Sequence, residues 1–210
     1  IGTVTTTDAD SDSIIYSIAG ADANSLAISS SGVLTFNTAP DFETKSSYTS
    51  SLNADDGTST STQNITVTIT NVNDNNPVIN SSSSFSANEN QTSAGSIDAS
   101  DADDDSLTYS LSGTDASSLT ISSSGVLTFN TAPDFETKTS YAASVNVSDG
   151  TNSVSQSITV SVTNLNDNSP RISSSSSFSA DENQTAIGSI SSSDADDDSL
   201  TYSLSGQDAS

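Results

Sequence analysis

Acidic residues recur in this chain as three short motifs, each repeated 93 residues further along. The motifs are Asp-Ala-Asp starting at Asp8, Asp101 and Asp194, Pro-Asp-Phe-Glu starting at Pro40 and Pro133, and Asn-Asp-Asn starting at Asn73 and Asn166. Carboxylate, side-chain amide and backbone oxygens are the ligands of calcium, which takes roughly six to eight of them. The chain contains no His and no Cys, the usual ligands of zinc and copper. The motifs therefore predict a repeated oxygen site for a hard cation.

Turn chemistry is the competing interpretation of these motifs, because Asp, Asn and Ser are common in ordinary turns. A single acidic cluster could be explained in that way. Here, however, separate clusters recur together at a fixed spacing, and the chain has only 3 basic residues to pair with its 27 acidic ones. The recurrence and the shortage of counter-charges favour cation binding.

The charge balance excludes several classes of function. At a net charge of -24 the chain is repelled by nucleic acids, whose binding needs Lys and Arg, and by anionic membrane surfaces. No His can act as the base of a catalytic triad and no nucleophile elbow occurs, so we expect no enzymatic activity. Hydrophobic residues make up only 31% of the chain, and a cation that cancels carboxylate repulsion would help such a sequence to fold.

The repeat length indicates one small domain per repeat. Solenoid repeats run to roughly 20–50 residues, so a period of 93 residues is too long for them and fits domains in tandem. With Pro77 and Pro170 taken as the ends of linkers, three segments result. Residues 1–77 form a repeat that lacks its first strand, residues 78–170 a complete repeat, and residues 171–210 the N-terminal part of a third.

Hydrophobic residues alternate with polar ones along the complete repeat, as in half-buried strands. Leu107, Tyr109 and Leu111 show this alternation, and so do the apolar residues between 158 and 162. No segment shows a helical stripe. About seven strands in one repeat, each with one apolar face, predict an all-β fold of two antiparallel sheets packed as a sandwich.

The repeated motifs resemble those of cadherin repeats, and they occur in the same order. The similar segments are Asn71–Pro77 and Asn164–Pro170 (the DxNDNxP linker), Phe85–Asn90 (xEN), Ala99–Asp103 (AxDxD), Pro133–Glu136 (LDxE) and Val147–Gly150 (the late-strand Asp-Gly). The resemblance covers the whole chain. The Ser-, Thr- and Asp-rich composition is similar to that of cadherin-like arrays in microbial adhesins and surface fibres.

The resemblance implies a seven-strand Greek-key sandwich, immunoglobulin-like and of the cadherin type, with calcium bound between successive domains. At the first junction the implied ligands are Asp41, Glu43, Asn71, Asn73, Asp74, Asn75, Asp101, Asp103 and Asp149. At the second junction they are Glu89, Asp134, Glu136, Asn164, Asn166, Asp167, Asn168, Asp194 and Asp196.

Two features depart from the family pattern. Asn71 and Asn164 stand where the family has its leading linker Asp, which removes one negative charge per junction, so the full three-ion complement is not carried over. Four further aspartates extend the Asp-Ala-Asp motif: Asp104, Asp105, Asp197 and Asp198. They either compensate for the lost charge or face solvent, and we expect them to face solvent.

The function that these patterns predict is structural. We expect a calcium-rigidified repeat array, an extender rod or filament segment of an extracellular adhesin or surface fibre, on the cell surface or secreted. Its partners would be calcium ions and neighbouring repeats, with self-association into fibres, and neither nucleic acid nor membrane insertion. The alternative is an adhesive module that recognises a glycan or a like array on another cell. Near-identical repeats argue against it, because recognition usually resides in a distinct end domain.

Overall fold

The computed structural model describes residues 1–208, so the last two residues of the predicted third segment, 209–210, lie outside the described residues. The chain divides into two compact units. Unit 1 comprises residues 1–75 with 102–105, and unit 2 comprises residues 76–101 together with the chain from residue 106 onward.

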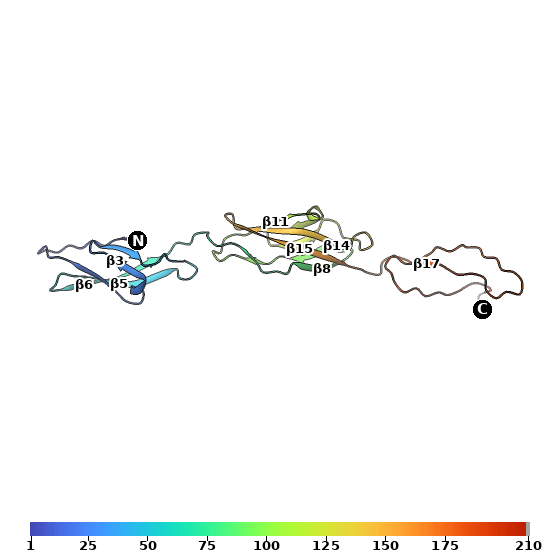
Figure 1. Ribbon diagram of the computed structural model, residues 1–210, viewed down its shortest axis with the longest axis horizontal. Coiled ribbons are helices and arrows are strands. Elements are labelled where there is room, and N and C mark those ends of the chain that lie inside the picture. Colours follow the sequence, from blue (N-terminus) through green and yellow to red (C-terminus); the bar gives the residue numbers. More distant parts are fainter. Residues whose placement is uncertain (209–210) are drawn as a thin grey trace. The chain divides into compact units, whose positions relative to one another are not determined.

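Unit 2 contains a sandwich of two sheets, which confirms the all-β fold predicted from the alternation (Figure 1). One sheet has four strands in the order β11-β14-β15-β8, formed by Thr108–Ser112, Ser140–Ser148, Ser153–Thr163 and Ser84–Asn88. The other has three strands in the order β12-β13-β9, formed by Leu119–Ile121, Val126–Phe129 and Ser93–Ser96. Two short strands, β7 (Val78–Ile79) and β10 (Ala99–Ser100), pair antiparallel in a separate two-stranded sheet.

One strand pair differs from the antiparallel expectation. β8 runs parallel to β15, with Phe85 opposite Val160, whereas the other strand pairs are antiparallel. The repeat begins with β7, which pairs with β10 in a separate two-stranded sheet, and β8 then forms the edge of the four-stranded sheet. The parallel pairing brings the end of β8 beside the end of β15, where the linker begins.

The core of this sandwich is narrow and wholly apolar. Leu127, Val145, Val147 and Val160 are fully buried and come from β13, β14 and β15. None of the seven sandwich strands contains a charged residue, and their exposed positions carry mostly Ser and Thr. The acidic residues of this repeat therefore lie in its turns and linkers.

Unit 1 repeats this pattern with counterparts of six of the seven strands. Its two sheets have the orders β1-β4-β3 and β2-β5-β6. The strands are Gly2–Thr3, Val33–Phe36 and Leu26–Ile28 in the first sheet, and Ile15–Ala19, Ser47–Asp55 and Thr60–Thr68 in the second. Its core is smaller and centres on Leu26, Leu34 and Leu52. A further pair, β16 (Arg171–Ile172) with β17 (Ser192–Ser193), follows the complete repeat.

The only helical elements among residues 1–208 are two 3-10 turns, η1 (Ala23–Ser25) and η2 (Ala116–Ser118). None of the described helices is long and apolar enough to cross a membrane.

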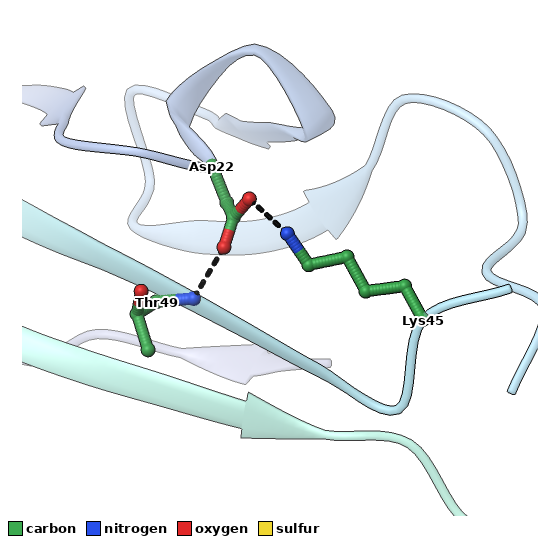
Figure 2. A network of polar contacts seen from close by, with 3 residues as sticks. All are labelled: Asp22, Lys45 and Thr49. Atoms are coloured by element: carbon green, nitrogen blue, oxygen red, sulfur yellow. Dashed lines mark hydrogen bonds and ion pairs between the residues drawn. The ribbon is translucent and has the colours of Figure 1, made fainter.

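Each 3-10 turn directly follows an aspartate whose carboxylate binds a lysine and a backbone N–H. Asp22 accepts hydrogen bonds from the Lys45 ammonium and, at 2.8 Å, from the backbone N–H of Thr49 (Figure 2). The Lys45 nitrogen also lies 4.8 Å from the centre of the Tyr48 ring. This ion pair joins the turn at η1 to the start of β5.

The same ion pair recurs in unit 2. Asp115 accepts hydrogen bonds from Lys138 and, at 2.8 Å, from the N–H of Ala142. The Lys138 ammonium, and after it the Ala142 N–H, holds the pKa of Asp115 below its usual value. Two of the 3 basic residues of the chain are therefore committed to the fold and cannot serve the other acidic clusters.

We expect the Asp115 ion pair to make stability depend on pH. Because its pKa is lowered by folding, its contribution is present above the unfolded-state value of about 3.9 and is lost as the pH falls through the folded-state value. Asp115→Asn should cost about 1–3 kcal/mol at pH 7, typical of hydrogen bonds to charged groups. Urea denaturation from pH 7 to pH 3 should show the wild type and this variant converging. The exposed Asp181→Asn serves as the control, and a difference that does not narrow between pH 7 and pH 3 would contradict the assignment.

Candidate metal centre

Carboxylates gather at three overlapping points in unit 2. In each group one oxygen per residue lies within 4.8 Å of the others. The groups are Glu89 with Asp134 and Glu136, Glu136 with Asp167 and Asp196, and Asp194 with Asp196 and Asp198. Glu136 and Asp196 each belong to two groups, so the three groups form one continuous acidic cluster. Six of its seven members were predicted from the sequence.

Glu89 is the most buried member of this cluster, with 1% of its surface exposed. Its Oε1 accepts the N–H of Leu165 at 2.7 Å, and its Oε2 accepts the N–H of Phe135 at 2.8 Å. Glu89 directly follows β8, and its own N–H donates to the carbonyl of Thr163 at the end of β15. The parallel pairing of β8 with β15 therefore places this carboxylate between the linker and the Pro-Asp-Phe-Glu loop.

Asp196 is the second buried carboxylate, 5% exposed, and it holds the linker from the other side. Its Oδ2 accepts the backbone N–H groups of Asp167 and Asn168 at 3.0 and 2.8 Å. The side-chain amide of Asn168, and then the backbone N–H groups, hold the pKa of Asp196 below its usual value. The amide of Asn164 donates to the backbone carbonyl of Asp196 at 2.9 Å.

Other acidic side chains crowd the carboxylate of Glu136, which belongs to two of the groups. Burial raises the pKa of Glu136, and the neighbouring carboxylates of Asp134, Glu89 and Asp196 raise it further. Asp167 contributes to the same crowding, with one oxygen bound by the amide of Asn90. Ionising all of these groups together is unfavourable unless a positive charge lies among them.

Unit 1 contains the corresponding group of Glu43, Asp74 and Asp103, again within 4.8 Å. Asp103 is 4% exposed, and its Oδ2 accepts the N–H groups of Asp74 and Asn75 at 3.1 and 2.8 Å. The amide of Asn71 donates to the Asp103 carbonyl at 2.7 Å, as Asn164 does to Asp196. The arrangement of linker and Asp-Ala-Asp motif is thus the same in both copies.

Two other predicted carboxylate ligands, Asp41 and Asp149, lie at the expected positions in the chain but outside these groups. Asp41 closes its own turn by accepting the N–H of Glu43 at 3.1 Å. Asp149, in the turn between β14 and β15, accepts the N–H groups of Thr151 and Asn152 at 2.7 and 2.6 Å. Asp101 follows β10, and two predicted amides lie in the linkers, so all three remain predictions as ligands: Asp101, Asn73 and Asn166.

One member of the acidic cluster, Asp198, was not among the ligands predicted from the sequence. Asp198 is exposed, as expected, yet its carboxylate belongs to the group of Asp194 and Asp196. Asp197 takes a left-handed backbone conformation with φ of 59°, which accompanies the turn of the chain between them. The alternation of Asp194, Asp196 and Asp198 along the sequence was the available signal.

The donor set fits a hard cation. Every ligand atom available in the cluster is a carboxylate, amide or backbone oxygen, the set that calcium prefers. The side-chain oxygen of Asn164 is buried and has no hydrogen-bond partner among the described residues. A buried oxygen without a hydrogen-bond partner is costly unless it binds a proton donor or a cation.

Comparison with known proteins shows what the fold is similar to. A family model described as "Bacterial Ig domain" matches residues 73–163. No curated protein gives a significant match.

Solved structures of cadherin extracellular repeats match most of the chain. The human CDH23 EC21-23 structure aligns with a TM-score of 0.79 at 21% identity, covering 98% of this chain and 83% of that one. The mouse cadherin-23 EC22-24 structure gives 0.71 at 23% identity, covering 100% and 75%. Protocadherin gamma B2 extracellular cadherin domains 3-6 give 0.72 at 26% identity, covering 87% of this chain and 51%, about half, of theirs. The chain therefore consists of tandem domains with the cadherin-like fold.

Proposed function

We propose that this chain is a calcium-rigidified structural repeat array, an extender rod or filament segment of an extracellular adhesin or surface fibre. The observation that carries the proposal is the pair of buried carboxylates, Glu89 and Asp196, that bind the linker backbone within a cluster of further acidic groups. Structure and adhesion, not catalysis, are the roles of cadherin-like and immunoglobulin-like repeats such as those it resembles.

Calcium would act by cancelling charge. The residues that would hold it in unit 2 are Glu89, Asp134, Glu136, Asp167, Asp194 and Asp196. They come from the end of β8, the loop before β14, the linker and the turn after β17. A bound divalent cation supplies the positive charge that these side chains lack, so segments that repel one another would be held together. The linker would then lose its freedom to bend.

The affinity expected of such a site places its function outside cells. Extracellular calcium modules bind at about 0.1–1 mM, close to extracellular and far above cytosolic calcium. Domains of this type are typical of extracellular proteins. We infer a surface-exposed or secreted location, with neighbouring repeats, and like arrays in fibres, as the partners.

The near-identity of the repeats favours a structural role over the recognition of a partner. Residues 28–45 are identical to residues 121–138, and they include the Pro-Asp-Phe-Glu loop and the lysine of the ion pair. The two copies also share the contacts of the linker with Asp103 and Asp196. Repeated identical units suit a spacer whose length matters more than any one surface.

Calcium should raise the thermal stability of the full chain. In about 1 mM free calcium the unfolding midpoint should be higher than in EGTA, since a ligand that binds only the folded state stabilises it. Glu136→Gln removes the carboxylate that two groups share, and it should weaken calcium binding at least about tenfold by isothermal titration, within the range seen for altered metal sites. The exposed Asp181→Asn, which removes the same charge outside the acidic groups, should leave binding unchanged. Equal midpoints in calcium and EGTA would refute the proposal.

A further inference from the structure

The side-chain amide of Asn168 lies among the carboxylates of one acidic group. Its Nδ2 donates to Asp167 Oδ1 at 2.8 Å, to Asp196 Oδ1 at 2.9 Å and to Glu136 Oε2 at 3.2 Å. These three acids are also the members of a group whose oxygens lie within 4.8 Å of one another. An amide nitrogen carries only two hydrogens, so three carboxylates share them.

The same arrangement occurs independently 93 residues earlier. Asn75 Nδ2 donates to Asp103 Oδ1 at 2.9 Å and to Asp74 Oδ1 at 3.1 Å, within the group completed by Glu43. In both copies the backbone N–H of the asparagine donates to the other oxygen of the buried aspartate. The backbone contact fixes where the side chain starts and directs its amide into the carboxylates.

We propose that the Asn168 amide and a calcium ion are alternative occupants of the same carboxylate group, and that Asn75 plays this part in the other copy. This inference rests on the proposed function. Calcium takes its oxygen ligands at about 2.3–2.6 Å, so an ion bound by these three acids needs the position that the nitrogen holds. The amide must then turn away. Asn168 and Asn75 are therefore positioning residues whose side chains compete with calcium, which differs from the ligand role that the resemblance implies for them.

The competition sets a threshold for calcium. Partial positive charge on the amide hydrogens relieves some of the repulsion among the three acids and keeps the linker bound when calcium is scarce. Those hydrogen bonds must be given up when the ion enters, so they weaken its binding. An aspartate at this position would add a further negative charge, and an alanine would leave the acids facing one another.

Replacing both amides tests the inference. In the full chain, Asn75→Ala with Asn168→Ala should bind calcium roughly tenfold more tightly by isothermal titration, since the lost hydrogen bonds to charged groups no longer oppose the ion. The same variant in EGTA should unfold at a lower temperature than the wild type. The matched control is Asn53→Ala with Asn146→Ala, a pair also 93 residues apart whose side chains accept hydroxyl groups from Thr62 and Ser155. This control should bind calcium as the wild type does.

The outcomes separate the inference from the proposed function. Tighter binding by the double variant supports both. Weaker or unchanged binding overturns the inference and leaves calcium binding by the wild type intact. A wild-type chain that binds no calcium overturns both. A second readout needs no variant, because nitrogen-15 NMR of the wild type should show the side-chain amide signals of Asn75 and Asn168 shifting with calcium while those of Asn53 and Asn146 stay in place. Unshifted Asn75 and Asn168 signals in a calcium-bound chain would also overturn the inference.

Discussion

Repulsion between carboxylates is the interaction on which the rest of this molecule depends. The seven sandwich strands of the complete repeat contain no charged residue, so the acidic residues are confined to turns and linkers. This separation lets an apolar core, mostly aliphatic with Phe129, hold a sandwich together in a chain of net charge -24. It also concentrates the electrostatic cost at a few points, where one ion can relieve it.

Those points coincide with the segments that join one repeat to the next. Glu89 and Asp196 are nearly inaccessible to solvent, yet both accept backbone N–H groups from the linker. The linker conformation is thus coupled to the charge state of buried carboxylates. A cation bound to these carboxylates would therefore constrain the linker backbone directly. The contacts of Asp196 with the linker recur in the other copy, where Asp103 makes them.

Much of the fold could be predicted because strand alternation and the 93-residue period are strong signals. The parallel pairing of β8 with β15 could not, since alternation reveals which face is buried but not the direction of the neighbouring strand. The carboxylate groups were predictable as residues, because repetition brings the same motifs together in each copy. Which end of an amide faces a carboxylate was not, and Asn168 illustrates this by donating through its nitrogen where an oxygen ligand was expected. The Lys138–Asp115 ion pair was overlooked although both lysines recur at the repeat spacing.

Small-angle X-ray scattering of the full chain, in calcium and in EGTA, tests most directly whether the ion stiffens the array. With calcium, charge cancellation at the linkers should yield a longer maximum dimension and a narrower distribution of conformations. Removal of calcium should restore a shorter, broader ensemble. Scattering curves that coincide under conditions in which calcium is bound would contradict the account, because the ion would then occupy the carboxylates without constraining the chain.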